Sequence, residues 1–156
     1  MLHPLDPVDR IMEVMEVAFP REFGEAWSRR QVSDALLLTG TRHGLIAPDG
    51  AQSPAVGQPT AGFWLSRGLF DEEELLLFAI HPDWRRQGLG HALLGAFIEG
   101  ARALGRRRLF LEMRRDNPAG HLYAAHGFRA VGIRPRYYRT ATGERIDAIT
   151  QERVLD

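Results

Sequence analysis

A glycine-containing turn at residues 85–91 (RRQGLGH) is the first place where residue types and spacing could do chemistry. An apolar run at 75–80 comes just before it, and a helical pattern at 89–103 begins within it. Backbone amides at a strand-to-helix turn are unpaired and the helix N-terminus adds positive potential, so the turn could bind an anion such as a phosphate. Its two glycines would let the backbone approach that anion closely. The same residues could also form a tight connection that binds no ligand.

Two nucleotide-binding motifs are excluded at this turn. The dinucleotide fingerprint G-x-G-x-x-G requires a third glycine where this chain has Leu93. A P-loop requires a lysine after its last glycine, and all 20 basic residues of this chain are arginines. A phosphate at this turn would therefore be held without a lysine.

Two further side chains, Glu112 and Tyr123, could do acid–base chemistry. Glu112 lies near the C-terminal end of a second apolar run, at 107–113, and ligands gather at this end of parallel strands. A carboxylate in a partly dry cleft can take a proton from an amine, directly or through water. By position alone, Glu112 also fits a solvated glutamate paired with Arg114 or Arg115, and Tyr123 fits a packing aromatic residue.

The elements that would hold these residues follow from hydrophobic periodicity and turn signals. Helices are expected at 7–18, from 25 or 28 to 38, at 89–103 and at 118–126, and strands at 41–47, 60–67, 72–81, 107–113, 128–134 and 145–155. Residues 48–59 and 135–145 are expected to be loops. The strands at 72–81 and 107–113 flank one helix, so they should be parallel. This order predicts a single mixed α/β domain over residues 1–156, with three layers.

Composition narrows the class of protein. The chain has 156 residues and a net charge of +0, so no global field favours nucleic acid or a membrane as a partner. The absence of cysteine excludes disulfides, thiolate nucleophiles and cysteine-bound metals. The six histidines show no paired ligand spacing, so no metal is expected. Residues 1–10 lack an apolar signal core and no apolar run approaches ~20 residues, so a cytoplasmic protein is expected.

The turn and the segment that follows it carry a family resemblance. The pattern R-x-x-G-x-G after HPDW (81–84), together with LFLEMRRDNPAGHLYAAHGF (109–128), resembles the GNAT superfamily of N-acetyltransferases. The resemblance covers residues 60–155 and implies a mixed, mostly antiparallel sheet with helices on both faces. It also implies a splayed parallel strand pair that holds the pantetheine arm of acetyl-CoA, the co-substrate. The implied cofactor-binding residues are Phe78, Ala79, Ile80, Arg85, Arg86, Gln87, Gly88, Leu89, Gly90, His91 and Asn117.

The resemblance also assigns catalytic roles. The stretch 122–128 matches the family pattern L-Y-x-x-x-G-F, whose tyrosine is the general acid, so Tyr123 would protonate the departing CoA thiolate. Glu112 would be the base that takes the proton of the acceptor amine, and a backbone amide of residues 78–80 would hold the oxyanion. Asn117 would cap the short helix, at a spacing to Tyr123 that is one residue shorter than in the family.

A narrower resemblance concerns the acceptor. Residues 133–149 (IRPRYYRTATGERIDAI) resemble the bacterial ribosomal-protein-alanine N-acetyltransferases, which have a similar Arg-rich, Tyr-Tyr and Gly-Arg-x-Asp-Ala-Ile sequence. Residues 19–28 (FPREFGEAWS) are similar to their Phe-Pro-Trp-Ser, with six residues inserted. The implied acceptor is the N-terminal α-amine of a ribosomal protein.

Two alternatives stay open from the sequence. The chain could acetylate a free small amine or amino acid, and the arginines within 134–145 favour an acceptor with carboxylate or carbonyl groups over a polyamine. It could also be a non-catalytic acyl-CoA-binding regulatory module. The presence of both Glu112 and Tyr123 argues against this second alternative.

Overall fold

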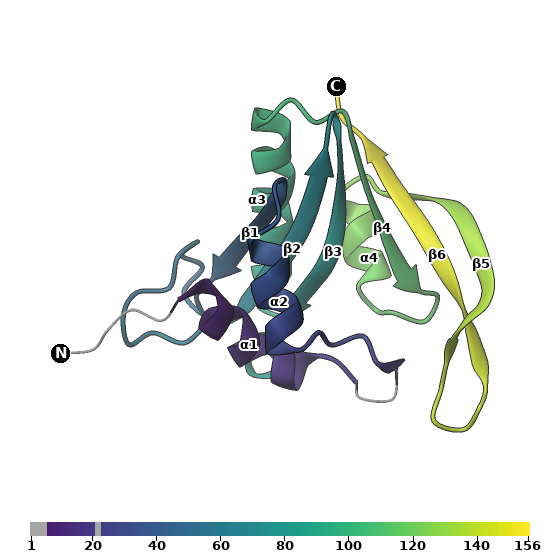
Figure 1. Cartoon of the computed structure of the whole chain (residues 1–156), viewed down its shortest axis with the longest axis horizontal. Helices are drawn as coiled ribbons and strands as arrows, with labels where there is room; N and C mark the ends of the chain where they lie inside the picture. The colour runs from purple at the N-terminus through teal and green to yellow at the C-terminus, as the bar shows by residue number, and fades with distance from the viewer. Residues whose placement is uncertain (1–5, 21–22) are drawn as a thin grey trace.

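The computed structural model describes residues 6–20 and 23–156, and Figure 1 shows a twisted sheet with helices on both of its faces. The elements in chain order are α1 (Pro7–Ala18), α2 (Arg29–Leu36), β1 (Thr41–Ile46), β2 (Gly62–Leu69), β3 (Glu72–Ile80), the 3-10 turn η2 (Pro82–Trp84), α3 (Leu89–Ala103), β4 (Arg108–Arg114), α4 (Gly120–Ala125), β5 (Arg129–Arg139) and β6 (Arg145–Val154). This arrangement confirms the predicted mixed α/β fold with three layers. The expectation of no signal core rests partly on residues 1–5, which lie outside the described residues. Within the described part of the chain, no helix is long and apolar enough to cross a membrane.

The sheet has the strand order β1-β2-β3-β4-β6-β5, and every neighbouring pair is antiparallel except β3 with β4. The parallel pair is joined only at its beginning, from Glu72 opposite Arg108 to Glu74 opposite Phe110. Beyond these residues the two strands separate, which confirms the predicted splayed pair. The facing strand edges therefore leave backbone polar groups that need other partners.

A buried carboxylate fixes the closed end of this gap. Glu73 is fully buried, and it accepts hydrogen bonds from Arg42 Nε (3.0 Å), Arg106 Nε (3.0 Å) and Ser66 Oγ (2.6 Å). A buried charge is stable only when it is paired and hydrogen-bonded. The network therefore ties β1, β2, β3 and the residues before β4 together, so that the strands part at a defined place.

Local signals set most element boundaries. Asp6 caps α1 by accepting a hydrogen bond from the backbone N–H of Asp9 (2.9 Å), and Ser28 and Gln31 form a capping box at the start of α2. The bounds of α1 and α3 are those expected, whereas α2 ends slightly earlier. Apart from the end of β5, the strands begin and end within two residues of their expected positions.

The helix after β4 begins later than expected. It starts at Gly120 rather than Pro118, and Ala119 stands at its N-cap position. The Asn117 side chain accepts a hydrogen bond from the backbone N–H of Ala119 (2.9 Å), two residues further on. An asparagine that bonds the backbone in this way closes a turn and competes with a helical start. The prediction that Asn117 caps this helix was therefore wrong.

The expected loop at 135–145 is also partly wrong. β5 continues to Arg139 and pairs with β6 as a long hairpin, which leaves residues 140–144 as its turn (Figure 1). The register shifts in the middle of β5, where Arg136 has φ 56° and donates its backbone N–H to Asp147 Oδ1 (2.9 Å). This irregularity interrupts the alternation by which a strand is recognised, so the sequence pattern did not reveal it.

Candidate active site

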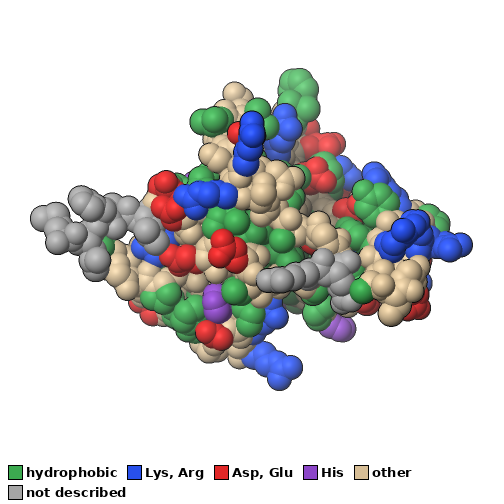
Figure 2. Space-filling view, turned by 60° about the horizontal axis from the view of Figure 1, so that its bottom comes forward, with side chains coloured by type: hydrophobic (Ala, Val, Ile, Leu, Met, Phe, Trp, Pro, Cys, Tyr) green, Lys and Arg blue, Asp and Glu red, His purple; other side chains and the backbone are tan. Residues whose placement is uncertain are grey.

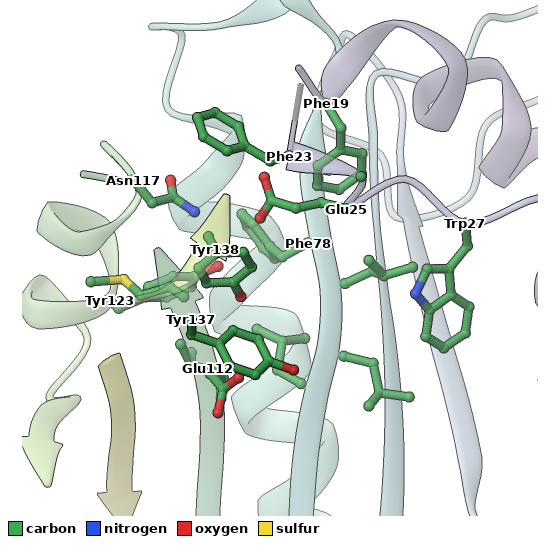
Figure 3. A pocket seen from close by; sticks show the side chains of 16 residues that line it. Phe19, Phe23, Glu25, Trp27, Phe78, Glu112, Asn117, Tyr123, Tyr137 and Tyr138 are labelled. Atoms are coloured by element: carbon green, nitrogen blue, oxygen red, sulfur yellow. The ribbon is translucent and has the colours of Figure 1, made fainter. Parts of the chain in front are cut away.

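Two adjoining cavities lie where β3 and β4 separate. The first, of about 280 Å³, is lined by the loop after α1, the middle of β3, the end of β4 and two tyrosines of β5 (Figure 3). Its charged lining side chains among the described residues are Glu25 and Glu112, so we call it the acidic pocket. The second, of about 640 Å³, is lined by the end of β3, the turn before α3 and the start of α4, and we call it the turn groove. The residues that line both cavities are Phe19, Glu25, Phe78 and Asn117.

The turn groove brings together most of the residues expected to bind the cofactor. Those that line it are Phe78, Ala79, Ile80, Arg85, Arg86, His91 and Asn117. Residues 87 and 88 complete the turn, residues 89 and 90 begin α3, and the side chain of Leu89 is buried in the core. None of these four residues is among those that line the groove. Cofactor binding by the whole set stays a prediction.

The turn has the backbone conformation that an anion site requires. Gly88, with φ 80°, stands at the N-cap of α3, and no side chain caps the first amides of that helix. Arg86 has φ 64°, a conformation that is strained for a residue with a side chain. Arg85 donates hydrogen bonds to the carbonyl oxygens of Ile80 and Ala18, both at 3.0 Å. Arg85 therefore holds the turn against α1, whereas the Arg86 guanidinium stays exposed at the groove.

Glu112 lies in the acidic pocket and is about three-quarters buried, with a side-chain exposure of 24%. Its Oε2 is 3.3 Å from Arg134 Nε of β5. The sequence suggested Arg114 or Arg115 as its partner, but neither plays that part: Arg114 pairs with Glu25 and Asp116, and Arg115 lies 3.6 Å from Asp147. Arg134 was missed because only the hairpin brings it beside β4.

Tyr123 also lies in the acidic pocket and is almost completely buried. Its ring packs edge-on against Phe78 and Phe128, at centroid distances of 6.1 and 5.9 Å. Burial raises the pKa of its hydroxyl above the usual value, and the charge of Glu25 raises it further. Within residues 6–20 and 23–156 the hydroxyl forms no hydrogen bond. A tyrosine with a raised pKa stays protonated at neutral pH.

Several residues of the acidic pocket lie in the two segments that carry the narrower resemblance, 19–28 and 133–149, but the sequence assigned them no individual role. Glu25 and Phe23 come from the loop after α1, whose residues 21 and 22 lie outside the described part of the chain. Tyr138 comes from β5, and burial followed by the charge of Glu25 raises its pKa to about 12. Beside the pocket, burial and the neighbouring Glu112 raise the pKa of the Glu74 carboxyl. Two sequence features could have pointed to an acidic pocket: the run of four acidic residues at 71–74 and the insertion at 21–26.

The expected influence of the Arg-rich segment is not seen in the lining of the pocket. Among the described residues that line it there is no arginine. The arginines of β5 are exposed, and Figure 2 shows arginine side chains on the side of the molecule that holds the β5–β6 hairpin. In the same described part, no group of three or more His, Asp or Glu side chains is arranged to hold a metal ion.

Comparison with known protein families identifies the class of protein that has this fold and these two cavities. The family model described as "Acetyltransferase (GNAT) domain" matches residues 50–130, which is just over half of the chain. The chain therefore belongs to the GNAT acetyltransferase family, as the sequence motifs predicted.

Particular relatives are also similar. The [ribosomal protein bS18]-alanine N-acetyltransferase of Escherichia coli K12 is 42% identical over 90 residues, which cover 57% of this chain and 60% of that protein. The match thus spans less than two thirds of that relative. The crystal structure of the E. coli ribosomal-protein-S18-alanine N-acetyltransferase has a TM-score of 0.77 and 28% identity, covering 100% of this chain and 94% of that chain. A Salmonella typhimurium protein solved with its cofactor acetyl-CoA shares the fold, with a TM-score of 0.56 and 23% identity over 63% of this chain and 60% of that chain.

Proposed function

We propose that this protein transfers the acetyl group of acetyl-CoA to a primary amine, the N-terminal α-amine of a protein of the ribosomal-protein-alanine type. The observation that carries the proposal is the junction of the two cavities. The turn groove meets the acidic pocket at Phe78, and Glu112 and Tyr123 lie on the acidic side of that junction. An acid and a base beside the end of a nucleotide-sized groove are the parts that amine acylation needs.

The residues of the turn groove fit acetyl-CoA. The start of α3 has no side-chain cap among the described residues and offers backbone N–H groups, and Arg86 adds a cationic side chain and His91 an imidazole at the same place. Apolar residues of β3 and α4 line the rest of the groove, and the edge of β3 beyond Glu74 has no strand partner in β4. Phosphates would be held at the turn, and the pantetheine arm would lie along the free strand edge. Acetyl-CoA, when bound, supplies the activated acetyl group.

The acidic pocket supplies the proton chemistry in this proposal. Glu112 takes the proton from the acceptor ammonium, directly or through water, because an α-amine with a pKa of about 8 is mostly charged at neutral pH. Tyr123, which is protonated at neutral pH, gives its proton to the leaving thiolate. A backbone N–H of residues 78–80 would hold the negative charge that develops on the oxyanion, and the support for this is that β3 has no partner in β4 beyond Glu74.

The acceptor is inferred from the lining of the acidic pocket and from the relatives. Two carboxylates and seven aromatic residues line this pocket, a combination that attracts a cationic amine through charge and through ring faces. The E. coli relative is named as an N-acetyltransferase of an alanine of ribosomal protein bS18. A free small amine is the second candidate, because a cavity of about 280 Å³ has room for little more than one residue.

A direct assay tests the proposal. Purified protein would be incubated with acetyl-CoA and either peptides that begin with alanine or free small amines, and acetylated products would be read by mass spectrometry. We expect an increase of one acetyl group at the peptide N-terminus, and its near loss in the Glu112→Gln variant. Acetylation of small amines alone would favour the second candidate. Tight acetyl-CoA binding without any acetylated product would overturn the proposal in favour of a binding module.

A further inference from the structure

The inserted loop places a second carboxylate, Glu25, in the acidic pocket. Six residues, 21–26, separate the two halves of the Phe-Pro…Trp-Ser pattern, and Glu25 is one of them. Its side chain is 16% exposed and lines both the acidic pocket and the turn groove. In the view of Figure 3, Tyr137 and Tyr138 lie between Glu25 and Glu112. Glu25 is therefore the carboxylate that stands where the two cavities join.

The position of Glu25 is fixed by β4. Its Oε1 accepts a hydrogen bond from Arg114 Nε (2.9 Å), and the Arg114 guanidinium lies over the ring of Phe23 at 3.7 Å from its centroid. Arg114 itself is nearly buried, with 8% of its side chain exposed. Oε2 of Glu25 forms no hydrogen bond within the described residues. One oxygen thus anchors the loop, and the carboxylate keeps a second oxygen for a ligand.

The charge of Glu25 is not cancelled by its anchor. Arg114 also pairs with Asp116 (2.7 Å), so one guanidinium is shared by two carboxylates and the group of three carries a net negative charge. Asp116 is half exposed and lines neither cavity. Burial, and after it the charge of Glu25, raises the pKa of both Tyr123 and Tyr138, in agreement with a negative charge close to these two phenols.

We infer that Glu25 binds the ammonium form of the acceptor amine at the mouth of the turn groove, before Glu112 removes its proton. The inference rests on the proposed function, because it concerns the acceptor of that reaction. A charge-assisted hydrogen bond to a fixed carboxylate selects a cation over its neutral acetylated product. Glu25 thereby makes the pocket specific for amines that arrive charged, and it helps the neutral product to leave.

Two matched substitutions separate this role from a purely structural one. Glu25→Gln removes the charge but keeps an oxygen that can accept from Arg114. Asp116→Asn removes the other carboxylate from the same arginine, outside both cavities, and serves as the control. The measured constants are the KM of a peptide that begins with alanine and the inhibition constant of the same peptide with its N-terminus already acetylated.

We expect Glu25→Gln to raise the KM of the amine about tenfold, the scale of one charged hydrogen bond, while the inhibition constant of the acetylated peptide stays about the same. Asp116→Asn removes a charge outside both cavities, so it should raise the KM of the amine much less than Glu25→Gln does and leave the inhibition constant of the acetylated peptide unchanged. Glu25→Asp should restore part of the amine binding. An equal weakening of amine and acetylated peptide would overturn the inference, since it would mean that Glu25 only shapes the pocket. Unchanged constants would overturn it as well.

The role of Glu25 can also be tested without the Glu25→Gln variant. If Glu25→Gln lowers the thermal midpoint so far that it cannot be assayed, the wild-type protein still provides a test. Salt should raise the KM of the amine and leave the inhibition constant of the acetylated peptide unchanged, because salt screens only the charged ligand. Equal salt effects on both would contradict a carboxylate contact. A wild-type protein that acetylates no amine would refute the proposed function itself, which is a different result.

Discussion

The turn groove and the acidic pocket are built in opposite ways. The groove is lined largely by two nearby stretches, from Phe78 to His91 and from Arg114 to Ala125, each folded by its own local signals. The pocket is lined by residues from four separate segments, 19–27, 75–78, 111–123 and 137–138, and its Glu112 is paired with Arg134 of β5. The difference indicates that a short sequence motif is enough to predict a binding site for a common cofactor. Recognition of a particular acceptor depends on segments that meet only in the folded chain.

The largest expected effect separates chemistry from cofactor binding. Glu112→Gln should lower kcat/KM for the amine about 1000-fold at pH 7, because general base catalysis contributes on that scale and the amine stays protonated. The loss should shrink as the pH rises above the pKa of the acceptor. The measurement is the steady-state rate of variant and wild type across pH. The control is the acetyl-CoA affinity of both proteins, measured by calorimetry. Equal rates for variant and wild type at every pH would refute the base assignment.

A somewhat smaller effect is expected for the acid. Tyr123→Phe removes only a hydroxyl and keeps the ring that packs against Phe78 and Phe128. Turnover should fall about 100-fold, since a proton donor to the leaving group is lost while packing is preserved. Pre-steady-state product formation would measure it, and the thermal midpoint should barely change. An unchanged turnover number would remove Tyr123 from the acid role.

A substitution at Arg86 tests acetyl-CoA binding by the turn groove separately from the acidic pocket. This residue has φ 64°, so Arg86→Gly should relieve backbone strain of about 1 kcal/mol while removing a guanidinium from the groove. We expect about tenfold weaker acetyl-CoA binding together with a higher thermal midpoint, because one charged hydrogen bond to phosphate is lost. Arg86→Ala, which keeps the strain, is the control. Unaltered affinity in both variants would show that the turn binds through its backbone alone.

The smallest effect concerns pH and the far end of the groove. His126 Nε2 lies 3.1 Å from His91 Nδ1, and burial, with His91 and Arg153, lowers the pKa of His126 in the folded state. A histidine with a lowered pKa stabilises the fold above its unfolded pKa, near 6.5, and loses that contribution as pH falls through the folded value. Denaturant unfolding should therefore show a small loss of stability below pH 6.5. His126→Gln should flatten that part of the profile, and an unflattened profile would assign the dependence to other groups.

Local sequence patterns are enough to predict a large part of the fold without any tertiary contact. The caps and apolar spacing of α1 and α3 fixed both helices, because capping and periodicity act within a few residues. The same locality revealed the turn before α3 and the parallel strand pair around it. Where a local signal was ambiguous the prediction failed: Asn117 closed a turn in place of capping a helix, and the irregular middle of β5 read as a loop.

The sequence by itself determined the family, and it singled out the turn at 85–91 and the candidate pair Glu112 and Tyr123, since each stands in a short motif. Only the tertiary structure decided what surrounds that pair. The hairpin set Arg134 beside Glu112, and the inserted loop set Glu25 on Arg114 at the junction of the two cavities. Such contacts join side chains far apart in the chain, and their energy depends on burial and distance rather than on spacing in sequence. The folded chain therefore decided which charges meet at the acidic pocket.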